Sequence, residues 1–578
     1  MPDCLTPSRI ARLFLLLWGI WGSAVLAQGP TWLVSGADEL LERNIRAHLS
    51  QASVGCDMAA FQVSRLLPEV RNRITRASRA LGYYHATATV DVARAGECWQ
   101  FTIAVVPGEP VRVSAINISV LNEQQLFSEV LENLPVAVGD QLQQADYERI
   151  KSSLSSLAVE NGFFDAGFVT SQLALDLQQN TAAMNIEFDP GTRYRIGSIR
   201  IQELEALSPD FLSRYMEMDS GAYYASESLL ELRNALNNSQ YFANVNVTPL
   251  LQRSDNFFVP LDVGLSLRPQ QAYSFGVGMT TDIGPRVRFD FENRYLNRRG
   301  HKFELNSGAS PVQSNIDLSY RIPWTRPATQ QLTLSSGLLH EDTDIYQNDI
   351  LKMGANYGFI NRFQWQQNVF LNFQHDDYTI NQSDQKSDLL IGGVNVSKTI
   401  ADDALYPSRG WRIFAQLSGA SDQILSTESF LQLQLGAKLI RTVGPGRVIL
   451  KLETGTSLVN ELVELPVSVQ YFTGGDQTVR GYKYQTLGPL NAQGEVNGGK
   501  HMLATGIEYD FNVASNWKLA LFTDAGNAFN NWTDYELKQS VGIGLRWLSP
   551  IGPIRIDLAS PMGSDNHVRL HITMGPDL

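Results

Sequence analysis

An arginine in a glycine-rich segment is the most chemically distinctive feature of the chain. The segment is TGGDQTVRGYKY, residues 473–484, where Arg480 stands between Val479 and Gly481. It belongs to a long connection, residues 459–499, and connections of this length are either functional or disordered. If the segment folds into a narrow interior, Arg480 needs an anionic partner, because an unpaired buried guanidinium is costly.

Two carboxylates on the segments that follow are the candidate partners. In GIEYDF, alternation of apolar and polar residues sends Glu508 inward, and in LALFTDAGNAF it sends Phe522 and Asp524 inward. A bidentate hydrogen bond between arginine and carboxylate would hold the connection inside. Replacing Arg480 is then expected to destabilise the folded connection, and reversing the charges of both Arg480 and Asp524 is expected to restore its stability in part. The alternative is that Arg480 lies at the tip of a solvated surface loop.

The elements that must position these groups begin near residue 271. SVGIGLRWLS, residues 540–549, places Val541, Ile543, Leu545 and Trp547 on one face and Gly542, Gly544 and Arg546 on the other. Repeated segments of this kind are typical of a transmembrane β-barrel with a lipid-facing surface and a polar lumen. A soluble antiparallel sheet also alternates, but the unbroken run of hairpins favours the barrel.

Sixteen such segments are predicted, an even number as bacterial barrels require. They cover residues 273–282, 286–296, 301–310, 314–324, 330–341, 350–360, 362–376, 387–400, 410–420, 428–440, 447–458, 500–511, 517–529, 538–548, 553–560 and 567–575. Short turns are expected on the periplasmic side, and long polar loops such as HDDYTINQSDQKS outside.

The first and last predicted strands must pair if the barrel is to close. The first contains Gly276 and Gly278, and the last ends at Gly575 and Pro576, where proline has no N–H to donate. These residues predict a weak seam that could act as a template for an incoming strand. The residues alone leave equally open a sealed barrel whose glycines only ease its curvature.

The first half of the chain contains three similar units. ALGYYHATATV at 80–90 resembles ENGFFDAGFVT at 160–170 and, more weakly, NSQYFANVNVT at 238–248. A spacing of this size indicates a structural repeat, and each unit predicts a strand, one or two amphipathic helices and two further strands. The predicted boundaries are 28–106, 107–189 and 190–268, with the barrel over 269–578.

The N-terminal segment predicts export. Arg9 and Arg12 precede an apolar run that ends in Val25 and Ala27, which is the pattern of a signal peptide over residues 1–27. An uncleaved anchor is the alternative. Removal of Cys4 with the signal leaves Cys56 and Cys98, which are expected to form a disulfide in an oxidising compartment; two free buried thiols are the other possibility. A net charge of −13 argues against binding of nucleic acid.

No set of nucleophile, base and orienting residue is predicted, so the protein is not expected to be an enzyme, and no cofactor or metal site is expected. His340, His375, His501 and His571 lie on different strands or loops, without a paired serine motif. HEDTD at 340–344 could bind a divalent ion, but its position favours a solvated external loop.

Taken together, VRGY, GIE, FTDAG and GIGLRWLSPIGPIRID resemble the superfamily of BamA, TamA and the two-partner secretion transporters. The resemblance extends over the whole exported chain, since the repeats look like POTRA modules, and three modules before sixteen strands most resemble TamA-like members. It implies that Arg480 is the motif arginine, with Asp524 and Glu508 as its partners on the barrel wall. Gly481 and Tyr482 would form the supporting turn, and the seam would be a lateral gate.

The resemblance also implies function. TamA-like proteins help to insert or secrete autotransporters and other β-barrel proteins in the bacterial outer membrane, with their POTRA modules in the periplasm. They work with TamB, a partner anchored in the inner membrane, and are also linked to phospholipid movement. An alternative is therefore a conduit for a secreted protein or for phospholipid.

Overall fold

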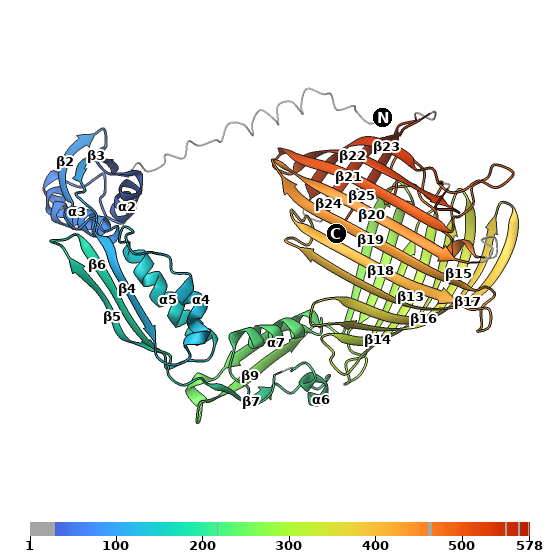
Figure 1. The fold of residues 1–578 in the computed structure, drawn as a ribbon, viewed down its shortest axis with the longest axis horizontal. Coiled ribbons are helices and arrows are strands. Elements are labelled where there is room, and N and C mark those ends of the chain that lie inside the picture. The colour runs from blue at the N-terminus through green and yellow to red at the C-terminus, as the bar shows by residue number, and fades with distance from the viewer. Residues whose placement is uncertain are drawn as a thin grey trace, which may run out of the picture. The chain divides into compact units, whose positions relative to one another are not determined.

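The computed structural model describes residues 29–216, 218–459, 465–533, 535–549, 552–563, 567–575 and 577. The predicted signal peptide, including Arg9, Arg12, Val25 and Ala27, and Pro576 of the predicted seam lie outside these residues. Figure 1 shows small modules of helices and strands in the first half of the chain and a rolled antiparallel sheet in the second half. Within the described residues, no helix has the length and apolar character needed to cross a membrane.

Each module has a three-stranded sheet in which the last strand is central. The first consists of β1 (Thr31–Ser35), α2 (Glu39–Leu49), α3 (Ala60–Ala80), β2 (Thr87–Ala95) and β3 (Cys98–Val106). The second consists of β4 (Arg112–Val120), η1 (Gln124–Phe127), α4 (Ser128–Glu132), α5 (Gln144–Glu160), β5 (Gly167–Asp176) and β6 (Thr181–Asp189). The third consists of β7 (Arg195–Ile201), α6 (Pro209–Ser213), α7 (Ser226–Asn238), β8 (Phe242–Pro249), η2 (Leu251–Arg253) and β9 (Phe258–Leu267).

Local sequence explains where the module helices begin and end. The side chain of Asp38 caps α2 by accepting a hydrogen bond from the Leu41 N–H. In α5, Tyr147, Ile150 and Leu154 are buried at helical spacing, as the apolar pattern predicts. The helix then ends before Gly162, whose φ of +84° suits glycine. Each of the three modules thus builds its own small core.

The second half forms one antiparallel sheet of sixteen strands, which confirms the predicted number. The strands are β10 (Gln271–Thr280), β11 (Gly284–Asn293), β12 (Lys302–Ala309), β13 (Gln313–Pro323), β14 (Gln330–Asp342), β15 (Tyr346–Ile360), β16 (Gln366–Ile380), β17 (Ser383–Ala401), β18 (Gly410–Ala420), β19 (Phe430–Val443), β20 (Gly446–Leu458), β21 (His501–Ala514), β22 (Trp517–Phe529), β23 (Lys538–Ser549), β24 (Gly552–Pro561) and β25 (Arg569–Met574).

Alternation assigns the two faces of the barrel wall. On β23, Val541 and Ile543 keep 44% and 52% of their surface exposed, whereas Arg546 keeps 1%. Apolar side chains therefore point toward lipid and polar ones into the lumen, as expected for a barrel in a membrane.

Two stretches that were expected to be loops lie wholly or partly in strands. HDDYTINQSDQKS was expected to be a long external loop, but its residues extend β16 and β17, and only Asn381 and Gln382 make the turn. HEDTD was expected to be a solvated loop, and the structure divides it: His340 to Asp342 complete β14, as the predicted strand 330–341 already implied in part, and Thr343 and Asp344 belong to the turn before β15. Polar composition here accompanies strand ends through which the backbone ladder continues, and Asp376 and Ser387 are buried although they are polar.

The sheet has two ends, β10 and β25, and among the described residues no backbone ladder joins them. The barrel is thus nearly closed, with its seam where the sequence predicts one.

Candidate functional site

The long connection between β20 and β21 folds into the barrel over residues 465–500, here called the folded loop. Short bridges between Tyr471 and Gly499, and between Thr473 and Leu487, hold it together. Val467 and Thr473 are almost fully buried. The loop is also fastened to distant strands, because Gln374 of β16 bonds the Ser468 hydroxyl and Tyr346 of β15 bonds Gln485.

Arg480 points from this loop into a cluster of carboxylates. Its Nε lies 2.7 Å from Asp524 Oδ2 and its Nη2 lies 3.1 Å from Asp524 Oδ1. Its Nη1 donates to Glu508 at 2.8 Å and to Asp557 at 3.0 Å. The structure thus brings together the three residues that the sequence singled out, and the alternative of a solvated Arg480 does not apply.

Three further charged groups complete the cluster. Arg546 is 1% exposed and donates to both Glu508 and Asp557. Lys451 donates to the Gln477 and Thr478 carbonyls, and its Nζ lies 4.0 Å from Asp524. The buried cluster therefore balances three cations, Arg480, Arg546 and Lys451, against three carboxylates, which is the condition under which buried charges are tolerated.

Sequence reasoning overlooked Arg546 and Asp557 as members of this cluster. The signal was available, because alternation places both side chains in the lumen. Alternation does not predict how deep a side chain lies along the barrel, because depth depends on strand register. In the observed register, Arg546 lies opposite Arg555 on the neighbouring strand, and Asp557 lies opposite His571.

Close packing accompanies the ion pairs. The guanidinium carbon of Arg480 lies 3.4 Å from the centre of the Phe522 ring. Val479 is fully buried against Gly526, where an added Cβ would come within 2.9 Å of the valine side chain. Glycine on the wall therefore makes room for the loop.

The turn after Arg480 is fastened separately. Gly481 has φ of +96°, and its N–H donates to His571 Nε2 on β25 at 2.8 Å. Tyr482 donates from its hydroxyl to the Gln539 carbonyl at 3.5 Å. The turn thus joins the cluster on β21, β22 and β24 to the last strand of the sheet.

The glycines at the seam differ from those under the loop. A Cβ on Gly276 or Gly278 would meet its nearest atoms at 3.7 Å and 3.8 Å, which is ordinary contact. Gly575 has φ of +142°, a conformation that favours glycine, with no atom within 4 Å of an added Cβ. Crowding therefore explains none of the three glycines.

A second buried ionic group lies in the lumen. Arg447 of β20 pairs with Asp510 and Asp577, and the ring of Tyr406 stacks on it at 3.4 Å. Arg555 also pairs with Asp577. This group joins β20, β21 and β24 to Asp577 after β25, and no pattern in the sequence predicts it.

The two cysteines of the first module lie together. Cys56 and Cys98 form a disulfide that links the segment before α3 to the start of β3.

Among the described residues, Asp282, Asp476 and His571 lie close to one another, and protein groups engage both ring nitrogens of His571. His340 and His375 each pair with a neighbouring aspartate instead, Asp349 and Asp388. His501 shares a hydrogen bond with Thr456. These three histidines therefore lie in separate pairs on different strands.

Residues 296–576 match the family model described as the Omp85 superfamily domain. The barrel is an Omp85 superfamily domain. Residues 32–107 match the model described as POTRA domain, TamA domain 1. An Omp85 barrel preceded by a POTRA module places the protein in the outer membrane, with its modules in the periplasm.

Two curated relatives carry the printed name outer membrane protein assembly factor BamA. That of Nitratidesulfovibrio vulgaris is 24% identical over 411 residues, which cover 66% of this chain and 51% of the relative. That of Neisseria meningitidis serogroup B is 22% identical over 490 residues, which cover 72% and 61%. The chain thus spans between half and two thirds of the length of these relatives.

The chain also resembles a solved structure over more than its barrel. BamA from Haemophilus ducreyi lacking POTRA domains 1–3 superposes with a TM-score of 0.65 at 17% identity, over 80% of this chain and 99% of that one. At this identity the likeness concerns the fold.

Proposed function

We propose that the protein is a non-enzymatic assembly factor that helps to insert or secrete β-barrel proteins, autotransporters among them, at the seam between β10 and β25. The observation that carries the proposal is that, within the part of the chain that the structure describes, no backbone ladder joins the two ends of the sheet. Unpaired backbone N–H and C=O groups cost several kcal/mol each in hydrocarbon. An incoming client strand would satisfy them, so its own pairing energy would drive its insertion.

The first strand of the sheet is suited to this role. Phe275 and Val277 of β10 are 80% and 87% exposed, more than the outward apolar residues of the interior strands. An apolar strand that alternates in this way offers a client both a hydrogen-bonding edge and a lipid-facing surface.

The periplasmic modules would hold the partner, which we propose is a TamB-like protein anchored in the inner membrane. The match of the first module to TamA domain 1 supports this choice. Each module sheet has outer strands, such as β2 and β5, that flank the central strand on one side only. Such edges accept a further strand.

A conduit for a secreted protein or for phospholipid is the alternative cargo pathway. The folded loop argues against passage through the lumen, because it is hydrogen-bonded to strands around the barrel. Arg480 donates to residues of β21, β22 and β24, and Gln485 accepts from Tyr346 of β15. Cargo that leaves through the seam, lipid included, is compatible with the loop in place.

The test is to crosslink β10 to β25 with an engineered disulfide. Cysteines at Met279 of β10 are combined with cysteines at Leu570 or Ile572 of β25, and the pair that oxidises fully is kept. Membranes that carry it are assayed for assembly of an autotransporter β-domain, read as its protease-resistant fraction. Assembly should be lost when the bridge is oxidised and return on reduction. A control bridge between the Cα partners Ser307 and Ile316 of β12 and β13 should have no effect. Full assembly with the seam bridged would refute the proposal.

A further inference from the structure

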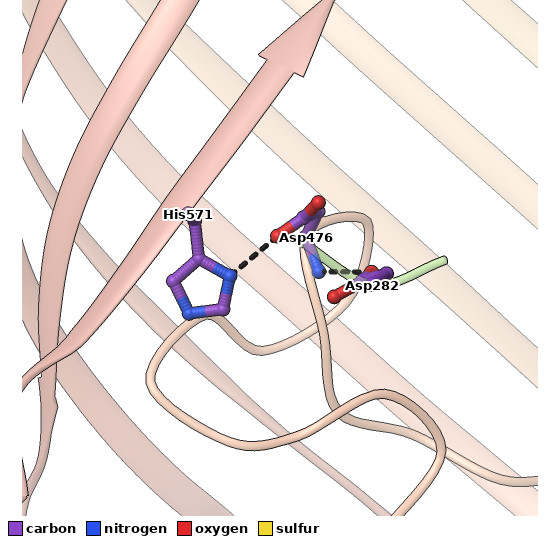
Figure 2. Close-up of side chains that lie close together, drawn as sticks. All are labelled: Asp282, Asp476 and His571. Carbon is purple, nitrogen blue, oxygen red and sulfur yellow. Dashed lines mark hydrogen bonds and ion pairs between the residues drawn. The ribbon is translucent and has the colours of Figure 1, made fainter. Parts of the chain in front are cut away.

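Three titratable side chains meet where the folded loop reaches both ends of the sheet (Figure 2). Asp476 belongs to the loop, His571 to β25, and Asp282 to the turn between β10 and β11. The Asp476 N–H donates to Asp282 Oδ2 at 2.7 Å, and the Asp476 carboxylate pairs with His571 Nδ1. One loop residue therefore contacts the first hairpin and the last strand at the same time.

Thr281 adds a bond that crosses the seam. Its hydroxyl donates to Asp476 Oδ1 at 3.1 Å and accepts the Ile572 N–H at 3.2 Å. The turn of the first hairpin is thus joined to the backbone of β25, although no ladder between β10 and β25 is present among the residues described.

The loop is shaped for this approach. Gly475 has φ of +98°, and a Cβ there would lie 2.6 Å from an Asp282 carboxylate oxygen. A larger residue would be strained at this φ and would displace the Asp282 carboxylate or the loop.

The imidazole of His571 links these contacts to Arg480. His571 Nε2 accepts the N–H of Gly481, the residue after the arginine, while Nδ1 faces Asp476. Both ring nitrogens are therefore engaged by the protein, which disfavours a metal ion as the group that holds the cluster.

We propose that Thr281, Asp282, Asp476 and His571 form a clasp that holds β10 against β25, couples the seam to the Arg480 cluster, and closes when Asp282 is protonated. The inference rests on the proposed function in one respect: it takes the seam to open when the protein works.

The direction of the pH dependence follows from what surrounds Asp282. Burial first, and then the charge of Asp476, raise the pKa of Asp282 to about 7, and His571 opposes this rise. Tyr484 also faces it, but burial raises the pKa of that phenol to about 12, so it stays neutral.

An open seam would return Asp282 to water and to an ordinary pKa of about 4. The closed clasp therefore binds the proton more tightly than the open seam does. Protonation favours closure fully below about pH 4, and this preference is lost as the pH rises to about 7. Above that pH two adjacent carboxylates repel each other in the clasp.

The test uses the full chain in lipid nanodiscs, with spin labels at Val277 of β10 and Leu570 of β25, both outward and exposed. Dipolar broadening of the spectrum measures the closed fraction. We expect this fraction to fall at least twofold between pH 5 and pH 8. Equal broadening at both pH values would overturn the proposal.

Variants separate the groups. Asp282→Asn should stay closed at pH 8, because its amide is neutral and its oxygen still accepts the Asp476 N–H. Asp476→Ala should open the seam at both pH values. Glu495→Gln, an exposed carboxylate elsewhere in the same loop, is the matched control and should match the wild type.

Three outcomes would contradict the clasp. They are an unchanged pH response in Asp282→Asn, a His571→Gln variant that stays closed at both pH values, which would make the imidazole the titrating group, and loss of broadening on adding EDTA, which would indicate a bound cation. Asp282→Asn tests the proposal even if Asp476→Ala fails to fold. No client protein is present, so an absence of assembly activity would leave this result standing.

Discussion

The guanidinium of Arg480 and the carboxylate of Asp524 meet edge to edge through two N–H···O bonds of 2.7 Å and 3.1 Å. Such a pair fixes orientation as well as distance. Because the remaining Nη1 donor also reaches Glu508 and Asp557, one side chain ties the loop to β21, β22 and β24. Arg480 thus specifies a single position for the loop inside the barrel.

Removing this side chain should release the loop. Arg480→Ala leaves three carboxylates with Arg546 and Lys451 alone, and we expect a loss of about 3–5 kcal/mol. Limited proteolysis of residues 473–499 and the temperature of heat-induced unfolding measure it. The unfolding temperature of Arg480→Lys should lie between those of Arg480→Ala and the wild type, because lysine keeps the charge but cannot form the bidentate hydrogen bond. A loop that stays protease-resistant in Arg480→Ala would contradict this account.

Exchanging the charges should fail to restore the loop. The sequence predicts partial rescue when Arg480 and Asp524 are both reversed, but that expectation considered one pair. An aspartate at 480 would face Glu508 and Asp557, so the double variant should be no more stable than Arg480→Ala. Recovery of more than half of the lost unfolding temperature would show that the other carboxylates contribute little.

Glycines under the loop should be less replaceable than glycines at the seam. A Cβ on Gly526 would lie 2.7 Å from the Leu503 carbonyl oxygen, so Gly526→Ala should cost about 1–3 kcal/mol. Gly276→Ala, where the nearest atom is 3.7 Å away, is the control and should cost much less. Heat-induced unfolding in detergent compares the two, and equal losses would contradict the packing argument.

The disulfide should stabilise the first module. It closes a loop between Cys56 and Cys98, 42 residues apart, and bridges of this length contribute roughly 2–4 kcal/mol. Replacing both cysteines by serine should therefore lower the unfolding temperature of the module, and a reductant should lower that of the wild type equally. An effect of reductant on the serine variant would point to another cause.

Deleting the first module should weaken capture of the periplasmic partner. If the TamB-like protein docks there, a chain lacking residues 28–105 should retain less of it in a pull-down from envelope membranes. The matched control is Arg480→Ala, which leaves the modules intact. Undiminished capture by the truncated chain would move the docking site to another module or to the seam.

Much of the barrel was predictable because alternation is a local property. The inward direction of Glu508 and Asp524, and the number of strands, follow from neighbouring residues. Polar strand ends are the exception: Thr379 and Asp384 belong to a ladder, although their composition suggests a loop. At these strand ends the backbone is still paired with its neighbour, but the side chains no longer face lipid and therefore need not be apolar.

The clasp could not be predicted in this way. Asp282, Asp476 and His571 are separated by 194 and 95 residues along the chain, and they meet only because the loop folds inward beside the seam. Arg546 and Asp557 could be predicted in part. Alternation shows that their side chains point into the lumen, but it does not show how deep along the barrel they lie.

The most direct test of the account is to capture a client strand on β10. A photo-crosslinking residue is placed at Ser274, Gly276 or Gly278, and crosslinks to an autotransporter β-domain are mapped during its assembly. The account predicts adducts from β10 to one terminal strand of the client, in a register that shifts by two residues as the probe moves by two. Equivalent probes at Asn306 and Gly308 of β12, a strand paired on both sides, should give none. Crosslinks spread evenly around the barrel, or none from β10 while assembly proceeds, would contradict strand pairing at the seam.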